Sequence, residues 1–149
     1  MQWLSALAGA IAFAASAAAL TVPDLTGPEW TLTAINGVAL TGDRPPTIFF
    51  SRDRDAALGA VRTVVNGFSG CNRYVGSYGL NERGHIRIEI RGMTKMACDG
   101  PRMELERNFL AALGAMANFE LRQDRTMSMT SGDGTTRLDF KQEAPKPAN

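Results

Sequence analysis

The residues best suited to chemistry in this chain are its two cysteines, Cys71 and Cys98, and its single histidine, His85. Two thiols could form a redox dithiol, contribute to a metal site or pair as a structural disulfide. Redox chemistry of the thioredoxin kind prefers a C-x-x-C motif at a helix start, and a metal site needs more ligands than these. A structural disulfide is therefore the leading interpretation, and two buried free thiols or redox or metal use remain the alternatives.

Nucleophilic catalysis would need His85 to be oriented by a carboxylate beside a serine or cysteine. The segment 67–70 contains Ser69 between glycines, but it is one residue short of a G-x-S-x-G elbow. Glu104 and Glu106 fall on different faces of a predicted helix, so they do not form an acid–base pair. Their place near the helix start suits the helix dipole instead. The sequence therefore predicts no enzyme, no catalytic residues, no metal site and no cofactor.

The remaining polar and aromatic candidates have plainer interpretations. Asn72 is expected to tolerate an unusual backbone angle and to bond to nearby main chain, in preference to binding a ligand. Tyr74 and Tyr78 share one strand face, so they are expected to pack in the core or at the barrel rim in preference to forming a stacking platform, and Trp30 is also a core candidate. His85 is expected to face solvent. If the fold contains an apolar pocket, the methionines are the first residues to consider, because methionine lines adaptable surfaces.

Length and charge set the broad class. The chain has 149 residues and a net charge of +1, which predicts one domain and no nucleic-acid partner. Residues 3–20 carry no charge and end in small side chains, which predicts a signal peptide over 1–19, with an uncleaved anchor as the alternative. No cysteine lies near residue 20, so a lipoprotein is not expected. Export would place the chain in an oxidising compartment, where two cysteines commonly pair.

Strand patterns dominate the chain after residue 28, and alternation is cleanest at 85–91, where three isoleucines alternate with charged residues. Extended segments are predicted at 29–35, 38–40, 47–50, 58–68, 74–80, 85–91, 118–122, 126–130 and 136–140. One helix is predicted over 101–113, and 51–57 is predicted to be turn-like. Because no βαβ rhythm appears, we expect a mainly β fold, an antiparallel barrel of about eight short strands with one helix. The domain is expected over 20–141, followed by a disordered polar tail over 142–149.

Four segments of the chain carry a family resemblance. They are Leu25-Thr26-Gly27-x-Glu29-Trp30-x-Leu32-x-x-Ile35-x-Gly37, then Gly67-Phe68-Ser69-Gly70-Cys71-Asn72-Arg73-Tyr74-x-Gly76-x-Tyr78, then Met93-Thr94-Lys95-Met96-Ala97-Cys98, then Met103-Glu104-x-Glu106-x-x-Phe109-x-x-Ala112-Leu113. In order and spacing these segments resemble the META domain of HslJ-like proteins, which are heat-shock-inducible proteins of the bacterial envelope. The resemblance extends over about 25–140.

The resemblance implies a barrel related in shape to the lipocalins, and an envelope protein loosely tied to stress, drug tolerance or motility. It implies no reaction, because the family has no established catalytic mechanism. Six motif residues are expected to be structural: Gly70, Asn72, Arg73, Tyr74, Gly76 and Tyr78. One departure is the segment 51–66, which is longer than the usual turn there and predicts an extended hairpin.

Two functions follow as expectations for a periplasmic or secreted protein that is monomeric by default and has no membrane span after signal cleavage. The first is a stress-related binding module that contacts an unknown envelope protein. The alternative is a lipocalin-like carrier of a small apolar ligand. A barrel filled by large side chains would favour the module, and an open apolar cavity of several hundred Å3 would favour the carrier.

Overall fold

The computed structural model describes residues 25–55 and 57–143, so the predicted signal peptide lies outside the described residues. The described part is mainly β and has one helix. Its elements are β1 (Glu29–Ile35), β2 (Val38–Ala39), β3 (Thr47–Arg54), β4 (Val61–Phe68), β5 (Arg73–Leu80), β6 (Ile86–Met93), α1 (Gly100–Ala115), β7 (Met116–Leu121), β8 (Thr126–Ser131) and β9 (Arg137–Gln142).

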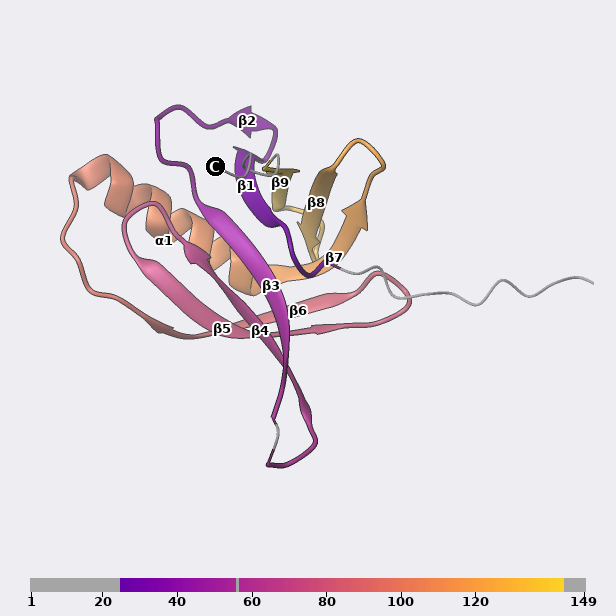
Figure 1. The fold of residues 1–149 in the computed structure, drawn as a ribbon. Helices are drawn as coiled ribbons and strands as arrows, with labels where there is room; N and C mark the ends of the chain where they lie inside the picture. The colour runs from indigo at the N-terminus through magenta and orange to yellow at the C-terminus, as the bar shows by residue number, and fades with distance from the viewer. Residues whose placement is uncertain (1–24, 56, 144–149) are drawn as a thin grey trace, which may run out of the picture.

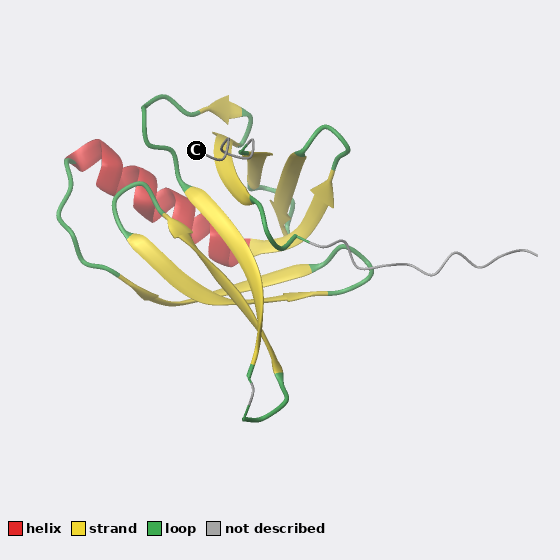
Figure 2. Ribbon diagram, in the orientation of Figure 1, coloured by secondary structure: helices red, strands yellow, loops and turns green. Residues whose placement is uncertain are grey.

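The strands form one antiparallel sheet that curls into a nearly closed barrel (Figure 2). The order is β6-β5-β4-β3-β1-β9-β8-β7, and β2 pairs with β1 outside this path. The two ends of the sheet approach at an isolated bridge between His85 and Asn118, where the Phe119 N–H donates to the Gly84 carbonyl at 2.9 Å. Helix α1 joins β6 to β7 and packs against β6 and β9 (Figure 1). The predicted fold class is confirmed.

Alternating side chains explain why these segments are strands. In β6, Ile86 and Ile88 are buried while Arg87 and Glu89 are exposed, as a strand with one solvated face requires. The turn after β1 is made by Asn36-Gly37, with φ of 51° and 78°, the left-handed conformation that this dipeptide adopts in two-residue hairpins.

Large side chains fill the interior of the barrel. Trp30, Tyr74 and Tyr78 are all buried, which confirms the predicted packing roles, and Phe50 meets Tyr78 edge to face with ring centroids 4.9 Å apart. The Tyr74 hydroxyl donates to the Thr47 carbonyl at 2.8 Å. Burial, with Glu29 nearby, raises the pKa of Tyr74 far above its usual range, so this hydroxyl stays protonated. Other fully buried side chains are Phe109, Phe140, Leu32, Ile48, Leu113, Met127, Met129 and Leu138.

The β3–β4 hairpin extends beyond the barrel (Figure 1). The turn predicted at 51–57 is wrong for its first four residues, because β3 continues to Arg54 and pairs it with Val61. The pairing supplies the backbone hydrogen bonds, and both faces of the projecting segment are solvated, so charged residues are tolerated there. The extended hairpin predicted from the length of 51–66 is confirmed.

The C-terminal boundary also differs from the expectation. Gln142, predicted to start the polar tail, is the last residue of β9 and pairs with Trp30. The Glu143 N–H then donates to the Glu29 carbonyl at 3.1 Å. The rest of the predicted tail, 144–149, lies outside the described residues.

Gly76 in β5 has no room for a side chain. A Cβ there would overlap the Glu89 carbonyl of β6 and lie 3.0 Å from the Ile90 Cα. We expect Gly76→Ala to lower the free energy of unfolding by about 2 kcal/mol through overpacking. Gly79→Ala is the matched control on the same strand, because nothing lies within 4 Å of its added Cβ. Urea unfolding measures both, and equal loss in the two variants would contradict the close approach at Gly76.

Candidate functional site

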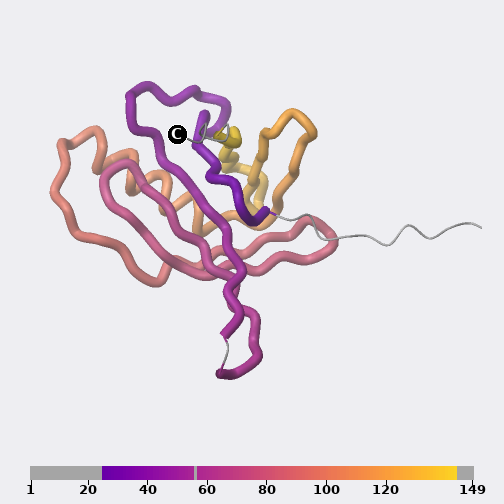
Figure 3. The backbone as a smooth tube through the Cα atoms, viewed as in Figure 1, coloured from indigo at the N-terminus to yellow at the C-terminus, as the bar shows by residue number. Residues whose placement is uncertain are grey.

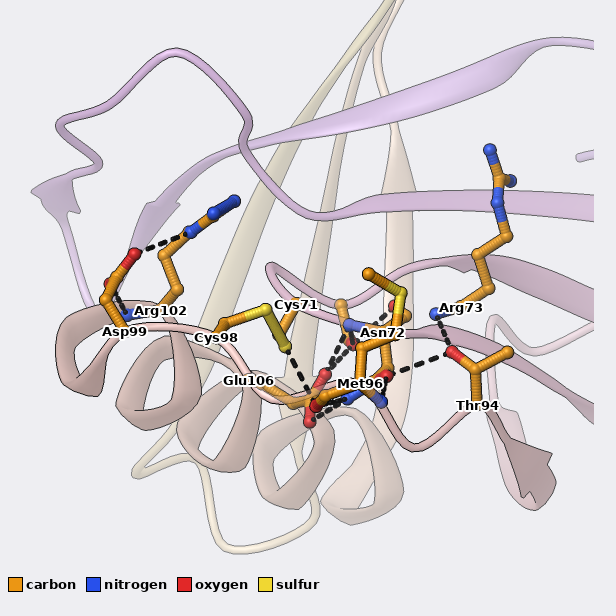
Figure 4. Close-up of a disulfide and its surroundings, with 10 residues drawn as sticks. Cys71, Asn72, Arg73, Thr94, Met96, Cys98, Asp99, Arg102 and Glu106 are labelled. Carbon is orange, nitrogen blue, oxygen red and sulfur yellow. Dashed lines mark hydrogen bonds and ion pairs between the residues drawn. A yellow bond between two sulfur atoms is a disulfide. The ribbon is translucent and has the colours of Figure 1, made fainter.

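A disulfide bond joins Cys71 and Cys98, with sulfurs 2.08 Å and Cα atoms 5.9 Å apart (Figure 4). Cys71 follows β4, and Cys98 ends the segment 94–98 between β6 and α1, which we call the strap. The bond therefore ties the start of the motif to the strap just before the helix begins.

The turn before the disulfide depends on Gly70. Its φ is 110°, in the region that favours glycine, and an added Cβ would lie 3.3 Å from the Leu105 side chain of α1. The Ser69 N–H closes the turn by donating to the Asn72 carbonyl at 2.8 Å. The prediction of an unusual backbone angle at Asn72 is therefore wrong. Gly70 adopts the positive φ in this turn, and Asn72 has a negative φ.

The Asn72 side chain instead links three elements. Its Oδ1 accepts hydrogen bonds from the Met96 N–H at 2.6 Å and the Thr94 hydroxyl at 3.0 Å, both in the strap. Its Nδ2 donates to the Glu106 carboxylate on α1 at 2.9 Å, and its backbone N–H donates to the same carboxylate at 2.7 Å. We call Asn72, Thr94, Met96, Glu106 and Ser69 the Asn72 clamp (Figure 4).

The helix-dipole role predicted for Glu104 and Glu106 is wrong, because the first turn of α1 holds no acidic residue. The part that Glu106 plays in the clamp was missed: only 7% of Glu106 is exposed, and its carboxylate accepts hydrogen bonds from Asn72 and the Ser69 hydroxyl. Burial alone would raise the pKa of Glu106, but the hydrogen bonds from Ser69, Asn72 and the Cys71 backbone outweigh it and hold the pKa below its usual range. A signal was available, since Glu106 shares a helical face with the buried Phe109 and Leu113, three and seven residues later.

The clamp is built for support. The Glu106 carboxylate is engaged by hydrogen bonds, and the Ser69 hydroxyl lies between that carboxylate and the Asn72 carbonyl. His85 is exposed, as expected, and its backbone N–H bonds to Asn81 in a turn at the other end of β6. Among the described residues, no group of three side chains that could hold a metal comes together. The arrangement therefore fixes the strap to the barrel and the helix.

Among the surface hollows lined by described residues, two bear on the argument. The disulfide hollow, of about 240 Å3, lies beside the bond and is bordered by Arg44, Phe68, Arg73, Met96 and Arg102. The hairpin hollow, of about 530 Å3, lies on β4–β6 at the base of the hairpin. Its lining residues are Val61, Arg62, Thr63, Val64, Gly76, Ser77 and Arg91.

Comparison with solved structures identifies proteins of the same fold. An NMR structure of a protein from Burkholderia xenovorans is 27% identical, with a TM-score of 0.59, and covers 90% of this chain and 99% of its own. A crystal structure of a duf4847 family protein from Bacteroides vulgatus is 11% identical, with a TM-score of 0.56, over 82% and 96% of the two chains, and shows the fold alone. None of the curated proteins matches this chain.

Two further findings concern the helix and the family of the chain. The helix within the described residues lacks the length and apolar character needed to cross a membrane. The model of the META domain family matches residues 23–145, which include all of the motif and clamp residues described above. The chain belongs to the META domain family.

Proposed function

We propose that this protein is a non-catalytic, exported binding module of the bacterial envelope that contacts another envelope protein. The observation that carries the proposal is the filled interior of the barrel. Phe50, Phe109, Phe140, Met127 and Met129 are fully buried in it. A lipocalin-like carrier needs an open apolar cavity of several hundred Å3, so the packing favours recognition on the outer surface over the carrier alternative.

The use of the two cysteines supports the proposed compartment. Disulfides persist in oxidising compartments, so the Cys71–Cys98 bond supports a periplasmic or secreted location, as does the predicted signal peptide over 1–19. Both cysteines of the chain are used in this bond. A stress-related role rests on the family resemblance.

A non-catalytic role is supported by the way the polar motif residues are used. Ser69, Asn72 and Glu106 form hydrogen bonds with one another, and Asn72 also bonds to the strap. These polar groups are therefore already engaged inside the protein. His85 lies apart from them on an exposed turn. The motif thus stiffens the barrel, and recognition is left to exposed side chains.

The projecting hairpin is the best contact surface on the described part of the chain. Leu58 and Val61 near its end are 75% and 58% exposed, so the projecting hairpin presents two apolar side chains to a partner. At its base the hairpin hollow adds Arg62 and Arg91, a mix of apolar and cationic groups that is typical of protein interfaces.

Site-specific photo-crosslinking in the native envelope tests the proposal. A photoreactive residue in place of Leu58 should give a discrete crosslinked protein species, and one in place of Val38 should not. Val38 is a matched control because it is 72% exposed and lies on β2, at the opposite end of the molecule (Figure 3). With the reactive group at Leu58, Val61→Ser should reduce the crosslink at least fivefold, about 1 kcal/mol. Identical crosslinking from positions 58 and 38 would contradict a hairpin contact.

A further inference from the structure

We propose that the disulfide hollow is a second binding site, for an amphiphilic anion: a phosphate or carboxylate joined to a short apolar body. The site lies beside the strap and uses none of the residues that line the hairpin hollow. The two proposals can therefore be tested independently of each other.

Uncompensated positive charge gives the hollow its preference for anions. Arg44, Arg73 and Arg102 border it, and none of its lining residues is acidic. Arg102 is paired with Asp99, with Nε 3.0 Å from the carboxylate. Within the described residues, Arg44 and Arg73 make no ion pair. Two guanidinium groups without carboxylates are thus available to bind a phosphate or carboxylate, which they match in geometry.

The wall between the arginines is apolar. Phe68, Met96, Ala97 and the disulfide line it, and Met96 is 63% exposed. The Arg44 guanidinium lies 4.9 Å from the centroid of the Phe68 ring, a cation–π contact that orients it toward the hollow. Exposed methionine is a flexible surface for irregular apolar groups. Because positive charge and apolar surface lie side by side, we expect the ligand to be an amphiphile. An anion without an apolar group would make no contact with Met96 and Phe68.

The Asn72 clamp and the disulfide hold the wall in place before any ligand arrives. The Asn72 side chain fixes both the N–H of Met96 and the hydroxyl of Thr94, and that hydroxyl in turn accepts the Arg73 N–H at 3.0 Å. Figure 4 shows Met96 and the disulfide between Arg73 and Arg102 along the strap. Because the backbone of the strap is already ordered, binding does not require this segment to fold.

The size of the hollow limits what it can enclose. At about 240 Å3 it is smaller than sites that bury whole drug-sized ligands. It accommodates an anionic group and the first carbons of an apolar chain, while the remainder stays outside. Such a ligand could be a free amphiphile or the head of an anionic lipid in a membrane, and the two share the same chemistry.

Titration with n-octyl phosphate below its micellar concentration, followed by NMR chemical shifts of the strap, tests the site. We expect saturable shifts at residues 94–98 and affinity at least tenfold weaker in Arg44→Gln/Arg73→Gln. The matched control is Arg52→Gln/Arg83→Gln, which removes the same charge from exposed arginines on the hairpin and on a distant turn. This control should stay within twofold of the parent protein. Met96→Gln should weaken binding about threefold through lost apolar contact.

Comparison probes separate the outcomes. Inorganic phosphate should bind at least tenfold more weakly than octyl phosphate, and equal affinity would overturn the amphiphile. Absence of saturation, or equal weakening in the two double variants, would overturn the site. Arginine-dependent binding to phosphatidylglycerol vesicles, but not to phosphatidylcholine vesicles, would assign the anion to a lipid head. Arginine-dependent binding of octyl phosphate without vesicle binding would assign it to a soluble amphiphile.

Discussion

Asn72→Asp should lower the free energy of unfolding by about 4 kcal/mol at pH 7, the size expected when a buried charge is left without compensation. The new carboxylate would lie against that of Glu106, which accepts the Asn72 Nδ2 at 2.9 Å and is 7% exposed. Two carboxylates in one site raise the folded-state pKa of one of them above its unfolded value. The resulting penalty is present at neutral pH and is relieved as pH falls below that raised pKa.

In the parent protein, the contribution of Glu106 to the free energy of unfolding changes with pH in the opposite direction. Hydrogen bonds lower the pKa of Glu106 in the folded state, so its stabilisation is present above the unfolded pKa of about 4.3 and is lost as pH falls through the folded pKa. The stability gap between Asn72→Asp and the parent should therefore narrow between pH 7 and pH 4. Urea unfolding at several pH values measures this.

Two further variants show whether the loss of stability in Asn72→Asp comes from the two facing carboxylates. Asn108→Asp adds the same charge at an exposed position of α1 and should change stability by less than about 0.5 kcal/mol. Adding Glu106→Gln to Asn72→Asp removes one of the two facing charges and should restore part of the loss at pH 7. An Asn72→Asp variant as stable as the parent at pH 7 would contradict the clamp.

Loss of the disulfide has the second large effect. Cys71 and Cys98 are separated by 27 residues in sequence, and closing such a loop restricts the unfolded chain by roughly 3.5 kcal/mol. We expect Cys71→Ser/Cys98→Ser to lower the free energy of unfolding by about that amount and the Tm by roughly 10–15 °C. Differential scanning calorimetry measures the shift.

Reductant provides the control for this prediction. A strong reductant should lower the Tm of the parent protein by a similar amount and leave the double serine variant unchanged. The loss should appear with the native barrel retained, since Cys71 and Cys98 join a turn to the strap and lie outside the strands. A parent protein whose Tm does not respond to complete reduction would show that the bond contributes little.

Local patterns were enough to predict most of the barrel. The alternation of Ile86 and Ile88 with charged residues predicts a strand within a few residues, because one buried face determines it. The end of β3 was missed because Arg52 and Arg54 carry no apolar pattern. Their strand structure comes from pairing with β4, and that pairing depends on a partner more distant in the chain.

The candidate sites were predicted only in part. The motif drew attention to Asn72 and Arg73, but the role of Asn72 came from strap and helix contacts that follow it by more than twenty residues. In the sequence, Glu106 is one of several charged residues near the predicted helix start. Its burial against Asn72 depends on the folded structure. No pattern around Arg44 indicated a binding role. Arg44 reaches the disulfide hollow because antiparallel pairing brings the start of β3 to the end of β4, where Phe68 lies.

We propose that this domain binds with its outer surface and keeps its interior filled. Titration with N-phenyl-1-naphthylamine, an uncharged apolar dye that fluoresces in apolar cavities, distinguishes a filled barrel from an open one, with an empty lipocalin as the positive control. The filled core around Phe50, Phe109 and Phe140 predicts no saturable rise in fluorescence at micromolar dye. A saturable rise that is unchanged both in Arg44→Gln/Arg73→Gln and in Val61→Ser, which alters the hairpin hollow, would place the dye inside the barrel and contradict this proposal.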